Sequence, residues 1–358
     1  MRPILTLTLN PALDLASHTP QVTPEVKLRC TAPQSDAGGG GINISRALAQ
    51  MGGRSTAFVA LAGPAGAEIA ALLAEAGIAT ASFPAPGPTR QSLTVTEEAS
   101  GKQFRFVMPG PQWRARDTAA ALQAIAALLP PEVPSEWRRE VSSGSPCSQT
   151  DAAAPGPARQ AASGTRGLPV LAEATAFVVL SGSQPPGVPV DFPATLARVT
   201  EARGAALLLD TSGPALAHLR ANPTPGIAVL RMDDTEAETL AGRALPTLTE
   251  TASFAETLVA AGLAQAVVIA RGAEGSVAVS AQGRWHCRPP RVPVRSKVGA
   301  GDSFMAGFTL ALAQGSDLPG ALRQGTAAAA AAVMTDATEL CQGADVARIL
   351  PDCVVAQM

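Results

Sequence analysis

Short aliphatic segments alternate with helical sequence along most of this chain, and this alternation constrains the fold more than any other feature. The aliphatic segments occupy residues 4–10, 176–182, 205–213, 227–232 and 266–272, and helical sequence separates each from the next. Strands that are apolar throughout are typical of a parallel sheet whose two faces are both covered. The sequence therefore predicts an α/β fold with a mostly parallel central sheet between helices.

Three segments depart from this alternation. Residues 17–36 and 90–108 alternate apolar and polar positions around turn residues, which predicts antiparallel strands in a small sheet over one end of the main domain. Residues 130–168 are rich in Pro, Ser, Ala and Gly and lack hydrophobic periodicity, which is typical of disorder. Because strands and helices resume afterwards, a surface insertion within one domain is favoured over a domain boundary.

Composition limits the possible partners. With 358 residues, 46% hydrophobic and 16% charged, the chain has enough apolar sequence for one large core. A net charge of -2 and an isoelectric point near 6.0 provide no basic field for nucleic acid or for a membrane surface. The five cysteines lack metal-ligand spacing, and no apolar run reaches the length of a membrane span. These features predict a cytoplasmic protein that binds small molecules.

Residues 298–308 (VGAGDSFMAGF) place a glycine-rich turn and a carboxylate immediately before helical sequence. The start of a helix exposes backbone N–H groups that have no partner within the helix, and the helix dipole adds positive charge there. An anion is therefore expected at this turn. Asp302 would repel that anion, so it either caps the helix or performs chemistry on a group held beside the anion.

A second glycine-rich segment, residues 36–53 (DAGGGGINISRALAQMGG), places four consecutive glycines before a predicted helix at 43–52. Glycine permits a backbone to approach a ligand closely, so the run is either a binding loop or a flexible turn. It is not a GxGxxG directly after the first strand, and the chain contains no GxxxxGK[ST]. Neither common nucleotide fingerprint therefore explains it.

Eight segments together resemble one known family. The chain is similar, in the order and spacing of these segments, to the ribokinase-like, PfkB-type sugar kinases: TLTLNPALD, KLRC, GGGGINISRAL, TRQSLTV, RFVMPG, LSGSQPPGV, LDTSG and VGAGDSFMAGF. The resemblance spans nearly the whole chain except residues 130–168. It implies a three-layer α/β fold with a small β lid through which two copies could pair.

The resemblance also implies an activity. It implies that ATP and Mg²⁺ serve the phosphorylation of a phosphorylated ketohexose, with fructose 6-phosphate converted to fructose 1,6-bisphosphate as the first expectation. The alternatives are 1-phosphofructokinase or tagatose-6-phosphate kinase activity. A different alternative is a catalytically weak protein that binds or senses phosphosugars.

The family pattern assigns roles to individual residues. It implies that Asp302 is the general base, beside an anion hole formed by Gly299, Ala300 and Gly301. It implies that the sugar site is built from Asp14 and Asn43 for hydroxyls, Gly39 and Gly40 for close approach, Lys27 and Arg90 for the existing phosphate, Arg105 as a third cation and, more weakly, Ser183. Taken singly, each of these residues also fits an ordinary turn, cap or solvated charge.

The nucleotide side departs from the family pattern. Arg231 replaces the usual lysine near the ATP phosphates and Asp233 replaces an asparagine, while Glu236 matches; Asp233 and Glu236 are the expected Mg²⁺ ligands. Lys297 stands where threonine is usual and either neutralises a phosphate or points to solvent. Residues 270–275 (ARGAEG), with Ala270, Gly272 and Gly275, resemble the loop at the adenine and ribose. Asp210 ends a strand and is either a cleft residue or a helix cap.

Overall fold

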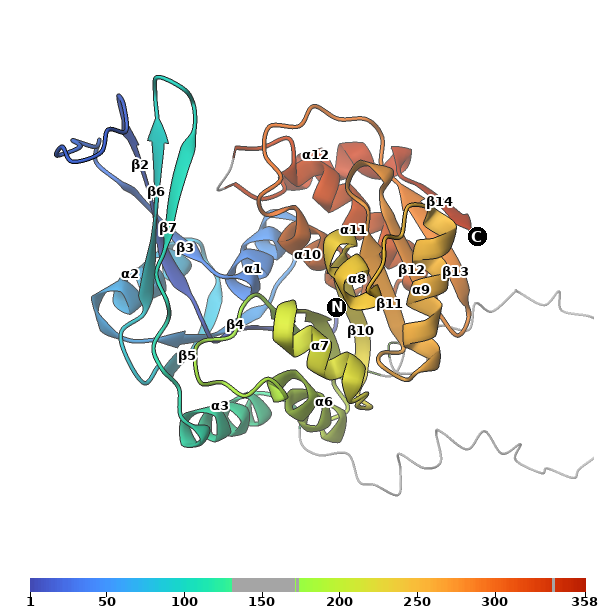
Figure 1. Cartoon of the computed structure of the whole chain (residues 1–358). Helices are drawn as coiled ribbons and strands as arrows, with labels where there is room; N and C mark the ends of the chain where they lie inside the picture. Colours follow the sequence, from blue (N-terminus) through green and yellow to red (C-terminus); the bar gives the residue numbers. More distant parts are fainter. Residues whose placement is uncertain (131–170, 172–173, 337–338) are drawn as a thin grey trace, which may run out of the picture.

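A ten-stranded sheet forms the centre of the protein (Figure 1). The structure is a computed structural model that describes residues 1–130, 171, 174–336 and 339–358, and the sheet lies within these residues. Across the sheet, the strands are β14 (Val354–Gln357), β13 (Gly283–Arg288), β12 (Ser276–Ser280), β11 (Ala266–Ala270), β10 (Ile227–Asp233), β9 (Ala206–Asp210), β8 (Phe177–Ser181), β1 (Ile4–Thr8), β4 (Thr56–Leu61) and β5 (Ala79–Pro84).

Neighbouring strands from β5 to β11 are parallel, whereas β11 to β14 are antiparallel. The predicted aliphatic strands all lie in the parallel part. Every residue of β1 and β8 is buried, because helices cover both faces of the sheet there. The predicted α/β architecture is therefore confirmed.

Two layers of helices enclose this sheet (Figure 1). The apolar side chains of one layer form a core with one face of the central sheet. This layer contains α1 (Gly40–Gln50), α10 (Ala300–Ala313), α11 (Leu318–Ala332) and α12 (Gly343–Ile349). The other layer contains α3 (Ala115–Ala127), α6 (Phe192–Ala202), α7 (Gly213–Ala221), α8 (Asp234–Ala241) and α9 (Leu248–Ala260). Short 3₁₀ turns, η1 (Gly272–Glu274) and η2 (Leu350–Asp352), connect the C-terminal elements.

A second sheet of four strands forms the predicted small lid, which we call the lid sheet. Its order is β3 (Gln34–Gly38), β2 (Ala12–Thr19), β6 (Arg90–Glu97) and β7 (Gln103–Val107). Helix α2 (Gly63–Glu75) packs between this sheet and the edge of the central sheet. The prediction of antiparallel strands was wrong for β2 and β6, which are parallel. Their directions agree because the chain passes through α1, β4, α2 and β5 between them.

Several boundaries differ from the predictions. Strand β2 begins at Ala12, because the chain turns into the lid sheet directly after β1. Helix α1 begins at Gly40 rather than at residue 43, so two of the four glycines belong to its first turn. The predicted insertion at 130–168 lies almost entirely outside the described residues and stays a prediction. Within the described part of the chain, each helix is too short or too polar to cross a membrane.

Candidate active site

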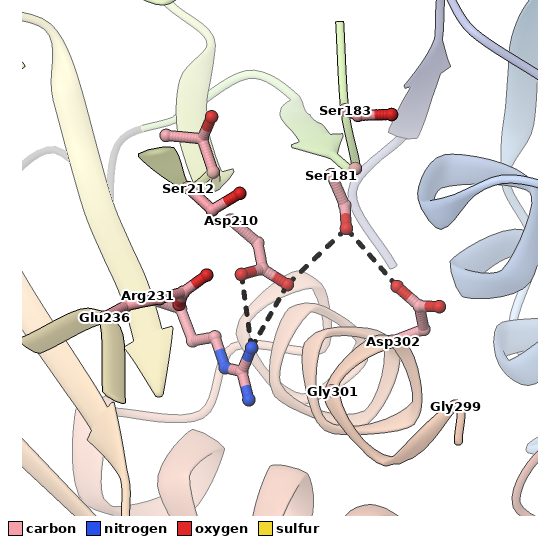
Figure 2. Close-up of a pocket in the computed structure, with 11 residues that line it drawn as sticks. Ser181, Ser183, Asp210, Ser212, Arg231, Glu236, Gly299, Gly301 and Asp302 are labelled. Carbon is pink, nitrogen blue, oxygen red and sulfur yellow. Dashed lines mark hydrogen bonds and ion pairs between the residues drawn. The ribbon is translucent and has the colours of Figure 1, made fainter. Parts of the chain in front are cut away.

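A pocket opens where β8, β9 and β10 end and α10 begins. Its volume is about 270 Å³, and its lining includes Ser181, Asp210, Arg231, Gly301 and Asp302 (Figure 2). In a parallel sheet covered by helices, ligands bind beyond the carboxyl ends of the strands, near the point where the strand order reverses. The reversal here lies between β1 and β8, beside the pocket.

The start of α10 forms one wall of the pocket. Gly299 is the N-cap residue with φ of 77°, a left-handed conformation that favours glycine, and Ala300 and Gly301 are the first helical residues. The first amides of a helix point outward along its axis without carbonyl partners. Gly299 and Gly301 both line the pocket, so this wall has the geometry of an anion site, as the sequence predicted.

Asp302 projects into the pocket from the first turn of α10. Its Oδ2 accepts a hydrogen bond from Asn43 Nδ2 at 2.9 Å, and its Oδ1 accepts one from Ser181 Oγ at 3.3 Å. The N-cap position has no side-chain capping bond. Because both hydrogen bonds of the carboxylate come from residues outside α10, the geometry favours a role in the pocket over a helix cap.

The surroundings of Asp302 change its acidity. Burial raises the pKa of the Asp302 carboxyl from 3.8 to about 6, and the nearby charge of Asp210 adds to this rise. Hydrogen bonds from Asn43 and Ser181 and the charge of Arg231 oppose it. A carboxylate with a pKa near the working pH can accept a proton in one step and release it in the next.

Arg231 forms a partly buried ion pair with Asp210 in the lining of the pocket. Its Nη1 lies 3.2 Å and 3.4 Å from the two carboxylate oxygens of Asp210, and each side chain is 13% exposed (Figure 2). The guanidinium also faces α10, since a Cβ built on Gly301 would lie 3.1 Å from Nη1. Asp210 is therefore a cleft residue rather than a cap, and Arg231 borders the expected phosphate position while already paired.

Asp233 and Glu236 form a capping box at the start of α8. Asp233 accepts a hydrogen bond from the Glu236 amide at 2.8 Å, and Glu236 Oε2 accepts one from the Asp233 amide at 2.9 Å. Of the two, Glu236 lines the pocket. Asp233 therefore caps α8 and lies outside the cavity lining, while its expected role at the nucleotide and metal stays a prediction. The described residues contain no cluster of three or more His, Cys, Asp or Glu that could hold a metal.

Two of the predicted sugar residues, Asp14 and Arg90, lie at neighbouring strands of the lid sheet, β2 and β6. Asp14 on β2 lies against Gly38, where a Cβ would overlap its carboxylate. Burial raises the pKa of the Asp14 carboxyl, while a hydrogen bond from Ser92 and the charge of Arg90 lower it. Arg90 donates to the Asn10 carbonyl at 3.3 Å and 3.4 Å. The glycine run that begins at Gly38 continues into α1, whose Asn43 donates a hydrogen bond to Asp302. It therefore connects the lid sheet with the part of the pocket that contains Asp302.

Other predicted residues lie around or outside this pocket. Ser183 lines it and accepts a 3.3 Å hydrogen bond from Asn10. Gly39 is the N-cap residue of α1, and Gly40 packs against Ser181. The remaining residues lie outside the cavity lining: Lys27 and Arg105 exposed on the lid segments, Lys297 exposed before α10, and Ala270, Gly272 and Gly275 around the end of β11.

Ser181 was missed by the sequence analysis, although a signal was present. It is the polar last residue of a strand that is otherwise apolar, and Asp210 ends the neighbouring strand in the same way. In register, Ser181 and Asp210 are paired positions of β8 and β9. A polar residue at the carboxyl end of a buried parallel strand is a pocket candidate.

Known proteins share this sequence and architecture. The chain is 35% identical over 346 residues to the ATP-dependent 6-phosphofructokinase isozyme 2 of Escherichia coli K12, covering 97% of each chain. It is 32% identical over 309 residues to a 1-phosphofructokinase of Xanthomonas campestris, covering 86% of this chain and 83% of the relative. The crystal structure of phosphofructokinase-2 from Escherichia coli in complex with fructose-6-phosphate superposes with a TM-score of 0.79 at 32% identity, covering 98% and 99% of the two chains.

The family comparison agrees with these relatives and with the resemblance read from the sequence. The fold is the ribokinase-like α/β fold with a small lid sheet. The model of the pfkB family of carbohydrate kinases matches residues 8–143 and 159–343. This chain is a member of the pfkB carbohydrate kinase family, an ATP-using phosphotransferase with an alcohol group as acceptor.

Proposed function

We propose that this kinase phosphorylates fructose 6-phosphate to fructose 1,6-bisphosphate. The observation that carries the proposal is the Asp302 carboxylate, held beside the amides of α10 with a pKa near 6. Asp302 accepts the proton of the acceptor hydroxyl while the hydroxyl oxygen bonds to the γ-phosphorus of ATP. The bond from that phosphorus to the bridging oxygen breaks, and ADP leaves. The α10 amides and Arg231 offset the negative charge on the transferring group.

The lid sheet supplies groups that suit a sugar that already carries a phosphate. Arg90 on β6, Arg105 on β7 and Lys27 in the lid segment 17–36 supply positive charge for the existing phosphate. Asp14 on β2 and Asn43 on α1 offer hydrogen bonds to sugar hydroxyls. Guanidinium groups bind phosphate through paired, charge-assisted hydrogen bonds, which favours a phosphorylated acceptor over a free sugar.

An assay of ADP release across a panel of sugar phosphates tests the assignment. We expect the highest kcat/KM with fructose 6-phosphate, in agreement with the 6-phosphofructokinase relative. A higher value with fructose 1-phosphate or tagatose 6-phosphate would contradict this substrate and support the corresponding alternative. Binding of a sugar phosphate without ADP release at any pH would instead support the catalytically weak binder.

Mg²⁺ fits the pocket through Glu236. This carboxylate lines the cavity and uses Oε2 for the capping box, and Mg²⁺ typically takes one or two carboxylates together with phosphate oxygens and water. When bound, the ion would neutralise charge on the ATP phosphates.

Removal of divalent cations is therefore expected to abolish turnover. With a chelator, ADP release should fall to background, and added Mg²⁺ should restore it. Glu236→Gln should raise the Mg²⁺ concentration needed for half-maximal rate by about tenfold, because a neutral amide attracts the ion less strongly than a carboxylate. Full activity in the chelator would contradict the assignment.

The lid sheet also supports pairing of two copies. Its edge strand β7 exposes Phe106 and Val107, 53% and 67% accessible, and Met108 follows at 43%. Such neighbouring apolar side chains on a sheet edge favour an interface. We infer a homodimer through this surface.

A charge on β7 should separate the two copies. The wild-type chain of 36.1 kDa should elute as a dimer, and Phe106→Glu should shift the mass measured by light scattering towards the monomer. The matched control is Val294→Glu, which places the same charge at a 61% exposed valine outside the lid sheet. A dimer that persists in Phe106→Glu, or a monomeric wild type, would rule out this interface.

A further inference from the structure

Ser181 stands between the two carboxylates of the pocket. Its Oγ lies 3.3 Å from Asp302 Oδ1 and 3.5 Å from Asp210 Oδ2 (Figure 2). A hydroxyl has one proton, so it donates to one carboxylate at a time. Which carboxylate receives this proton decides what Ser181 contributes to the site.

The charges around the two carboxylates favour donation to Asp302. Asp210 is already compensated, since Arg231 Nη1 contacts both of its oxygens. Asp302 receives a hydrogen bond from the neutral amide of Asn43 and has no cation bonded to it among the described residues. The Ser181 hydroxyl also lies closer to the Asp302 carboxylate than to the Asp210 carboxylate. A charge-assisted hydrogen bond is therefore worth more at Asp302 than at Asp210.

The serine side chain is held in place by its surroundings. Ser181 is 6% exposed at the end of β8, and a Cβ built on Gly40 would lie 2.5 Å from its Oγ. The N-terminal turn of α1 thus packs directly against the hydroxyl. Because the same helix supplies Asn43, the two donors to Asp302 are fixed relative to each other.

We propose that Ser181 is a positioning residue for phosphoryl transfer, which directs the Asp302 carboxylate towards the acceptor hydroxyl and keeps it ionised near neutral pH. The inference rests on the proposed role of Asp302 as the base. The groups that face Asp302 are Asn43 from α1, Ser181 from β8, Asp210 from β9 and Arg231 from β10. Of these, the Ser181 hydroxyl and the Asn43 amide stabilise the carboxylate through direct hydrogen bonds.

The test compares Ser181→Ala with the wild-type protein by two measurements. The first is the titration of Asp302, followed by carboxyl ¹³C NMR of protein labelled at aspartate, with the signal assigned by its loss in Asp302→Asn. Removing one donor to the carboxylate should raise the titration midpoint by about one pH unit. The second is the pH profile of kcat, whose acidic limb should move by the same amount, with kcat at pH 7 about five- to tenfold lower and KM within about twofold.

Two further variants distinguish a specific effect on Asp302 from a general effect on packing or stability. Ser45→Ala also removes a buried serine hydroxyl, which bonds to Thr6 at 2.7 Å and Ser55 at 2.8 Å, and it should leave both pH midpoints unchanged. Ser181→Cys keeps a weak donor of similar size and should recover part of both shifts. An unchanged Asp302 titration in Ser181→Ala would overturn the inference. Absence of transfer by the wild-type chain with every sugar phosphate would overturn the proposed function instead.

Discussion

Replacing Asp302 with asparagine should slow phosphoryl transfer by about two to four orders of magnitude while the sugar phosphate and ATP still bind. Asparagine keeps the shape of the side chain and can still accept a hydrogen bond from Asn43, but it cannot take a proton from the acceptor. Single-turnover transfer and calorimetric binding of each substrate measure the two effects separately. Near-normal transfer in the folded variant would rule out Asp302 as the base.

The same variant should be more stable than the wild type at neutral pH. The pKa of Asp302 is raised from 3.8 to about 6 in the folded chain, so folding disfavours its ionised form, by about 3 kcal/mol when both states are ionised. This gain in Asp302→Asn should be complete above pH 6 and disappear as the pH falls towards 4. Urea unfolding at several pH values measures it. A helix cap predicts nearly equal stability, because asparagine and aspartate cap equally well.

Replacing Arg231 with methionine should lower the free energy of unfolding by about 3 kcal/mol. The variant leaves the partly buried Asp210 carboxylate without its cation, and breaking a largely desolvated pair from one side is strongly destabilising. Removing the second charge as well, in Arg231→Met with Asp210→Asn, should recover much of the loss. Urea unfolding of the wild type, both single variants and the double variant gives the coupling energy.

A more exposed ion pair provides the matched control. Arg46 and Asp36 lie 3.4 Å apart, with side chains 27% and 21% exposed, so Arg46→Met should cost about 1 kcal/mol or less. Equal losses at the two positions, or a double variant as unstable as the sum of its single variants, would contradict a special energetic role for the Arg231–Asp210 pair. In folded protein, loss of Arg231 should also weaken transfer, since the guanidinium faces the start of α10.

The parallel sheet could be predicted because its strands are buried on both faces and are therefore apolar at every position, as in β1 and β8. The parallel pairing of β2 and β6 could not be predicted, because the alternation of apolar and polar residues within a strand does not show in which direction it runs relative to its neighbour. That direction depends on the elements the chain traverses between the two strands. The start of α1 was predicted too late because glycine is a poor helix former, and here close packing against β1 and β8 outweighs that propensity.

The parts of the site that depend on local sequence patterns were easier to predict than the parts that depend on long-range contacts. The turn before α10 was readable because the glycines, the carboxylate and the helix are adjacent in sequence. Asp233 was assigned to the nucleotide, although Asp233 and Glu236 also form the D-x-x-E spacing of a capping box, the role they have in the structure. Ser181 and the Arg231–Asp210 pair could not be found from local patterns, because their contacts join residues that lie 21 to 121 positions apart in the chain.

The glycine run at residues 38–41 joins β3 of the lid sheet to α1, at a place where no side chain fits. Under the proposed function, the lid sheet carries the acceptor through Asp14 and Arg90, while the central layers carry the base and the phosphoryl site. The distance over which the phosphoryl group travels then depends on the angle between the lid sheet and the central layers, rather than on any one contact. Alignment of this kind is sensitive to substitutions far from the reacting atoms, wherever they change how α2 packs between the two sheets.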